Sequence, residues 1–306
     1  MTGCERSARA LLLAALGSIA CGAGHAGALQ FCDHPAALNA AQKDTLLRFG
    51  AIIKTELENS GARLALVARS GLDLSRFGLR YSHAGFSLKA SPNTPWSVRQ
   101  LYYACDEGRP RIFDQGLAGF LLGTDDPAIG YVSVVLMPAA QAGELERAAL
   151  NNARALQLLN AAYSANAYAW GLQYQNCNQW VVEMLASAWG RIDDDADAPR
   201  AQAQRWLAAH DYAPSRVEVG NRALIWASAF VPWLHSDDHP RGDLAQRVYR
   251  VSMPAAIESF VRSTLPAASR IEFCHTDRHV VVHRGWEPIA EGCTPGAQDT
   301  VIPLAD

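Results

Sequence analysis

A cysteine and a histidine stand in local settings that suit nucleophilic catalysis. Cys177 ends the polar run Tyr174-Gln175-Asn176 and begins an apolar stretch that is predicted to be a helix. A thiol at a helix N-terminus lies at the positive end of the helix dipole, and this position favours the nucleophilic thiolate. His83 lies near the start of a predicted strand, where an imidazole can serve as the base and later as the acid. The backbone N–H groups of the first helical turn can also stabilise a tetrahedral oxyanion.

These two residues need a helix and a sheet to position them, and the sequence predicts both. The helix covers residues 177–189 and is apolar around most of its surface. His83 belongs to a strand at 81–88, and Gly85, on the same face, is expected to leave space beside the imidazole. The fold class is therefore α+β, with an antiparallel sheet packed on the helix that begins at Cys177. Other strands are predicted at 63–69, 97–105, 131–137, 270–274 and 279–284, and other helices at 39–59, 144–163 and 199–210.

The first residues follow the order of a secretory leader. Arg6 and Arg9 precede an apolar run at 10–20, and the residues up to Ala28 fit a cleavage site. That run is shorter than the roughly 20 residues of a membrane span. We therefore expect a periplasmic or secreted protein, cleaved near Ala28, without an integral membrane span in its mature chain. Lipidation at Cys21 is a less favoured alternative, because the usual Leu three residues earlier is missing.

The cysteines outside the leader are odd in number. In an oxidising compartment four of them can form two disulfides. Cys274 and Cys293 flank a short, turn-rich segment and are predicted to pair. Cys32 with Cys105 is then the remaining pair, which leaves Cys177 as a thiol.

Several other kinds of site find no support. The chain has 27 Lys+Arg and 30 Asp+Glu, a net charge of −3, which is no electrostatic footprint for nucleic acid. No functional cofactor motif is present, so no cofactor is expected. His275, His279 and His283 invite a zinc interpretation. However, His279 and His283 on one strand would lie roughly 13 Å apart, too far to bind one ion, so no metal is expected.

The motifs resemble two families. His83-Ala84-Gly85-Phe86 is similar to the His-x-Gly-hydrophobic strand of NlpC-type cysteine peptidases, and Asn176-Cys177 to the start of their cysteine helix. Because His83 precedes Cys177, the order is similar to the circularly permuted branch of the papain-like superfamily. The mature chain also resembles the bacterial family called domain of unknown function 2145, which has no assigned activity. That second resemblance rests on the runs 80–85, 163–168 and 174–180.

The NlpC-type resemblance implies a role for several residues. Cys177 is the implied nucleophile and His83 the implied base. The orienting residue should lie on the following strand, where Gln100 is the first choice and Tyr102 shares its face. Gln175 and Asn176, just before the nucleophile, are candidate oxyanion donors. His279 is the alternative base, less favoured because its strand lacks the Gly two residues further on.

The predicted function is an exported cysteine hydrolase or acyltransferase that cleaves an amide, ester or thioester in the cell envelope. Cell-wall peptides are the first substrate class, from the resemblance, and acylated lipids or proteins the second. The alternative is a non-catalytic, disulfide-stapled binding or scaffold domain in which Cys177 is buried or bridged. The predicted organisation is a signal peptide at 1–28, a papain-like core at 29–190 and a C-terminal extension packed on it at 191–306.

Overall fold

The computed structural model describes residues 37–105, 107–220 and 231–304. The predicted leader, the alternative lipidation site Cys21 and the half-cystine candidate Cys32 lie outside the described residues. In the described part of the chain, no helix combines the length and the apolar character needed to cross a membrane.

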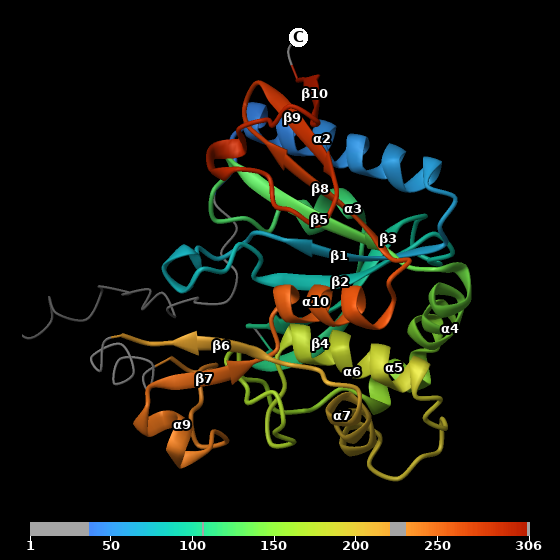
Figure 1. The fold of residues 1–306 in the computed structure, drawn as a ribbon, viewed down its shortest axis with the longest axis vertical. Coiled ribbons are helices and arrows are strands. Elements are labelled where there is room, and N and C mark those ends of the chain that lie inside the picture. The colour runs from blue at the N-terminus through green and yellow to red at the C-terminus, as the bar shows by residue number, and fades with distance from the viewer. Residues whose placement is uncertain (1–36, 106, 221–230, 305–306) are drawn as a thin grey trace, which may run out of the picture. The chain divides into compact units, whose positions relative to one another are not determined.

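An eight-stranded sheet forms the centre of the fold, and each of its neighbouring strand pairs is antiparallel (Figure 1). The predicted α+β class with a large antiparallel sheet is therefore confirmed. β8 pairs with β5, so the sheet crosses the predicted domain boundary at residue 190. The strands are, in spatial order, β10 (Thr300–Pro303), β9 (His279–Arg284), β8 (Ser269–His275), β5 (Gly130–Leu136), β1 (Leu64–Arg69), β2 (His83–Leu88), β3 (Ser97–Ala104) and β4 (Arg109–Gln115).

Helices cover both faces of this sheet (Figure 1). One face packs on α2 (Ala40–Asn59) and α3 (Leu117–Leu121). The other packs on α4 (Ala139–Leu150), α6 (Cys177–Trp189) and α10 (Pro254–Thr264). The remaining elements are α5 (Asn152–Gln157), α7 (Pro199–Ala209), α9 (Arg241–Ala245), the hairpin of β6 (Ser215–Glu218) with β7 (Val248–Val251), and two short 3-10 turns, Ser75–Phe77 and Glu291–Cys293.

Local sequence signals explain where several helices begin. Asn39 and Gln42 form the predicted capping box of α2, each side chain accepting from the other residue's backbone N–H. The prediction of a single helix at 144–163 is wrong, because the structure has two helices, α4 and α5, in this region. The helix is broken at Asn151, which ends α4 and whose side chain caps α5, because Asn favours the cap over the helix interior.

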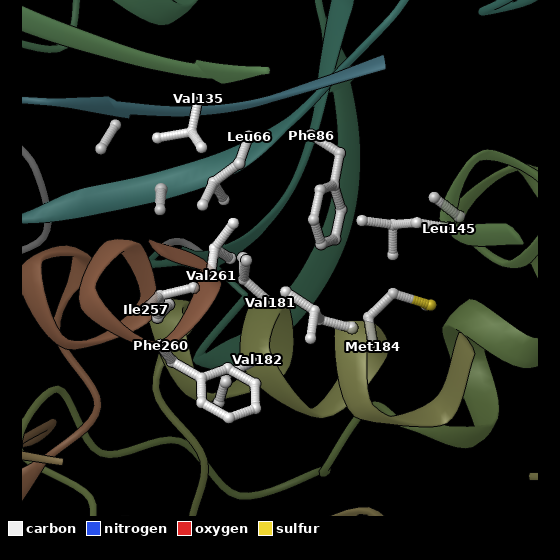
Figure 2. Packing of buried hydrophobic residues seen from close by; sticks show 14 of the residues in the cluster. Leu66, Phe86, Val135, Leu145, Val181, Val182, Met184, Ile257, Phe260 and Val261 are labelled. Carbon is white, nitrogen blue, oxygen red and sulfur yellow. The ribbon is translucent and has the colours of Figure 1, made fainter. Parts of the chain in front are cut away.

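The helix that begins at Cys177 is buried from its first residue to Ala188, and it lies against the centre of the sheet. Figure 2 shows Phe86 of β2 above Val181 and Met184 of α6, with Phe260 of α10 on the other side of the helix. An almost fully enclosed helix has few ways to shift, so its N-terminus is held firmly relative to β2.

The packing of Phe86 gives a first testable prediction. Phe86→Ala should lower the free energy of unfolding by about 3–5 kcal/mol, because it leaves a cavity between β2 and α6. Phe113→Ala is the matched control, since Phe113 is 41% exposed. Its cost should stay below about 1.5 kcal/mol, the size of an aromatic pair. Urea denaturation of both variants measures the difference, and equal losses would contradict this packing.

Candidate active site

The N-terminus of α6 is built by its capping residue. Asn176 has extended backbone angles, and its side chain accepts from the N–H of Gln179 over 2.6 Å, which starts the helix at Cys177. Among the cysteines that the structure describes, Cys177 carries a thiol rather than a disulfide, and it is 8% exposed. The predicted thiol at the first position of a helix is therefore present.

A buried carboxylate fixes the segment that leads to this thiol. Glu183, one and a half turns into α6, is fully buried and accepts from Gln175 Nε2 over 2.6 Å and from Gln204 Nε2 over 2.8 Å. Arg200 of α7 binds it through Nε and a terminal nitrogen, at 2.8 and 3.1 Å. Arg200 also donates to backbone carbonyls of the 171–174 segment. The carboxylate therefore ties together α6, α7 and the chain just before Cys177.

The two candidate oxyanion donors have structural roles. Gln175 donates to Glu183 and to the Leu158 carbonyl, and its oxygen accepts from Asn160 N–H. Asn176 is the helix cap, and its amide nitrogen points to two backbone carbonyls at 3.3 Å. Both amides thus donate to structural partners, and their role as oxyanion donors stays a prediction. The backbone of the first turn of α6 is another source of oxyanion donors.

His83 bonds the residue that was expected to orient it. His83 Nε2 and Gln100 Oε1 lie 2.5 Å apart, and Gln100 Nε2 donates to Gln115 Oε1 over 2.8 Å. The sequence suggested that Gly85 leaves space beside the imidazole, but the structure shows close neighbours there. A Cβ there would lie 2.6 Å from Val98 Cγ1, so the glycine is needed for the close approach of β3.

The start of β2 meets the start of α6. Asn178 Nδ2 donates to the Ser82 carbonyl over 3.1 Å. This bond joins the residue after Cys177 to the residue before His83. Cys177 and His83 thus lie in adjoining segments of the fold. The two residues that join these segments, Asn178 and Ser82, are 96 positions apart in the sequence.

His83 lies where β2 and β3 part. Regular pairing of these strands ends at Phe86 and Arg99, although β2 extends back to His83. Alternation directs His83 toward Phe120 of α3, with the ring centroids 6.0 Å apart, whereas Ala84 belongs to the cluster around α6. The imidazole therefore bridges the two strands where their backbone ladder has ended.

A second buried charge network lies just before His83. Glu272 of β8 is fully buried and accepts from Arg80, from Tyr81 and from the Ile289 N–H. Arg270 also bonds Tyr81, and burial together with the Glu272 carboxylate raises the pKa of Tyr81 well above its usual value. These contacts anchor the 80–81 segment to β8. No sequence pattern pointed to them, because the partners are about 190 residues apart.

The histidines of β8 and β9 lie on strands other than β2, whereas His235 stacks on Tyr174, three residues before Cys177. His279 begins β9, and β8, β5 and β1 separate that strand from β2, a distance of about 19 Å at normal strand spacing. His279 therefore lies well away from the strand that carries His83. His283 pairs with Asp299 over 2.6 Å, and His275 is buried against Phe49. The described residues hold no cluster of ligands for a metal ion.

One of the two predicted disulfides can be checked fully in the described residues. Cys274 and Cys293 are bonded as predicted. Cys105 is also disulfide-bonded, and Cys32, its predicted partner, lies outside the described residues.

Tyr102, the second choice for the orienting residue, packs edge-to-face on Phe113.

The fold and the site define a mixed α/β protein in which a large antiparallel sheet packs on a helix headed by a thiol. The chain belongs to the family described as "Uncharacterized protein conserved in bacteria (DUF2145)", which matches residues 56–261. That range contains Cys177, His83 and Gln100. No curated protein and no solved structure matches the chain.

The Glu183 network predicts a large loss on removal of its arginine. Arg200→Met should lower the free energy of unfolding by about 3–5 kcal/mol, because it leaves a buried carboxylate without its charged partner. Arg191→Met is the control, since Arg191 pairs with Glu144 at the surface and is 83% exposed. The control should lose at most about 1 kcal/mol. Chemical denaturation compares the two, and a small loss for Arg200→Met would disprove the anchoring role.

Burial of His275 predicts a pH dependence of stability. Burial lowers the pKa of His275 below its usual value near 6.5. The folded state therefore binds fewer protons than the unfolded state, and the free energy of unfolding should fall as the pH drops below about 6.5. His275→Leu removes this group and should flatten the profile between about pH 7.5 and 5. The exposed His210 supplies the control, His210→Gln, in which His275 is intact and the fall in stability at low pH should persist. A profile of unaltered slope in His275→Leu would refute the assignment.

Proposed function

We propose that this protein is an exported cysteine hydrolase or acyltransferase of the cell envelope, with Cys177 as nucleophile, His83 as base and Gln100 as the residue that orients His83. The observation that carries the proposal is the 2.5 Å contact between His83 Nε2 and Gln100 Oε1, at the strand end to which the N-terminus of α6 is bonded. A nucleophile, a base and an orienting group from three elements are the parts that such catalysis requires.

The chemistry follows from which atom of His83 is engaged. Because Gln100 presents its oxygen, the imidazole donates Nε2–H to it and keeps Nδ1 as the proton acceptor. His83 Nδ1 takes the thiol proton, and the Cys177 sulfur attacks the substrate carbonyl carbon. The oxyanion is held by backbone N–H groups of the first turn of α6. When the intermediate collapses, the imidazolium returns the proton to the leaving amine, alcohol or thiol, and water or an acceptor then releases the acyl group from sulfur.

The parting of β2 and β3 supports this assignment. A side chain on the α3 face of an intact ladder would be screened from α6 by the strand itself. His83 is the first residue of β2, and its bond to Gln100 crosses the strands beyond their last backbone pair. His83 therefore lies at the end of β2 that α6 contacts through the bond from Asn178 to Ser82.

The arrangement also supports a papain-like, circularly permuted NlpC-type core. A cysteine-headed helix packs on an antiparallel sheet, the histidine lies on one strand and its polar partner on the next. Disulfide bonding at Cys274–Cys293 suits the periplasmic or secreted location that the leader predicts. On this proposal the substrate is an envelope peptide, with an acylated lipid or protein as the second class.

One observation favours the alternative, a non-catalytic scaffold. Cys177 is 8% exposed, and the amides of Gln175 and Asn176 beside it are used for structure. A small buried thiol of this kind also occurs as a simple core residue. The two functions differ in the reactivity of the sulfur.

Alkylation of Cys177 distinguishes them. Iodoacetamide at neutral pH should modify Cys177 in the folded protein, and His83→Ala should slow this reaction by about 10²-fold, the lower range for loss of a general base. His279→Ala is the matched control and should react like the wild type. Peptide mass spectrometry gives both the site and the rate. Failure of Cys177 to react, or equal rates in the two variants, would favour the scaffold.

A further inference from the structure

We propose that Gln115 is a positioning residue that sets the tautomer of His83 through Gln100. The inference concerns a residue beyond the three assigned above, and its catalytic consequence rests on the proposed function. The tautomer itself is a property of the hydrogen-bond chain and is measurable without any activity.

The hydrogen bonds that link Gln115, Gln100 and His83 pass through two side-chain amides in one direction. Gln115 Oε1 accepts from Gln100 Nε2 over 2.8 Å, and Gln100 Oε1 faces His83 Nε2 over 2.5 Å. An amide has a donor end and an acceptor end, so the group facing one side fixes the group facing the other. With the Gln115 oxygen toward Gln100, the oxygen of Gln100 must face His83, which then carries its proton on Nε2.

The opposite direction is chemically complete as well. If both amides rotated, Gln115 would donate to Gln100, and the Gln100 NH₂ would donate to His83 Nε2. The imidazole proton would then sit on Nδ1, and the nitrogen needed to take the thiol proton would be lost. Gln100 is only 2% exposed and is held at both ends, so its amide can rotate only together with that of Gln115.

Gln115 is placed for this role by the start of α3. It is the last residue of β4, paired with Val98 across the ladder, and it is exposed. A Cβ on Gly119 would meet Gln115 Cγ at 2.9 Å and Nε2 at 3.0 Å. The glycine therefore lets the Gln115 side chain lie across α3 and extend to Gln100.

The test replaces the outer amide by groups with one polarity. In Gln115→Glu the carboxylate can only accept, so it should keep the Gln100 oxygen toward His83. In Gln115→Lys the ammonium can only donate, so it should rotate the Gln100 amide and move the imidazole proton to Nδ1. Both substitutions fall on an exposed side chain, and folding should tolerate them.

The tautomer is read by nitrogen NMR of ¹⁵N-histidine-labelled protein, with the His83 signals assigned by their loss in His83→Gln. We expect Nε2–H in the wild type and in Gln115→Glu, and Nδ1–H in Gln115→Lys. Thr94→Lys controls for charge alone, because exposed Thr94 lies beside Gly116, next to Gln115 in the chain. This control should keep Nε2–H. The proposal is overturned if Gln115→Lys keeps Nε2–H or if Thr94→Lys loses it.

The alkylation rate of Cys177, measured on the same samples, separates this inference from the proposed function. Gln115→Lys should react at least about tenfold more slowly than Gln115→Glu, since its His83 Nδ1 carries a proton and cannot accept the thiol proton. A tautomer that switches with no change in rate would uphold the role of Gln115 and refute His83 as the base. A rate change without a switch would refute the role of Gln115.

Discussion

The Glu183 carboxylate is the interaction on which the candidate site depends most. It is buried inside a helix that is itself enclosed, and its donors come from the segment before Cys177 and from α7. A charge in such a position is stable only with all its partners, so the network has essentially one arrangement. That arrangement determines where the chain turns into α6 and therefore where the thiol lies.

The other half of the site is anchored in a similar way. Glu272 holds Arg80 and Tyr81, the residues just before the strand that carries His83, and it does so from β8. Two buried carboxylates thus fix the two segments that the bond from Asn178 to Ser82 brings together. Replacing such networks by apolar residues often leaves stability unchanged, so their value here lies in defining one geometry for the site.

Local signals in the sequence were sufficient to predict several elements of the fold and part of the candidate site. Short sequence patterns predicted four features: the cap at Asn39, the start of α6 at Cys177, the pairing of Cys274 with Cys293 and the membership of the bacterial family. The NlpC-type resemblance was enough to direct attention to Gln100, which bonds His83. The strand β4 was missed because Arg109-Pro110-Arg111 lacks an apolar alternation, and the break at Asn151 was hidden within a run of helix formers. The Glu272 network could not be predicted, because it joins β8 to residues about 190 positions earlier in the chain.

The proposed catalysis requires that the Cys177 sulfur is a nucleophile whose proton is taken by His83. Intact-mass spectrometry after brief exposure to a small activated ester, p-nitrophenyl acetate, tests it most directly. We expect a transient acetyl adduct on Cys177 that forms in the wild type, disappears with time as the thioester is released, and fails to form in His83→Ala. An adduct that never forms in the wild type, or that forms equally in both proteins, would contradict it.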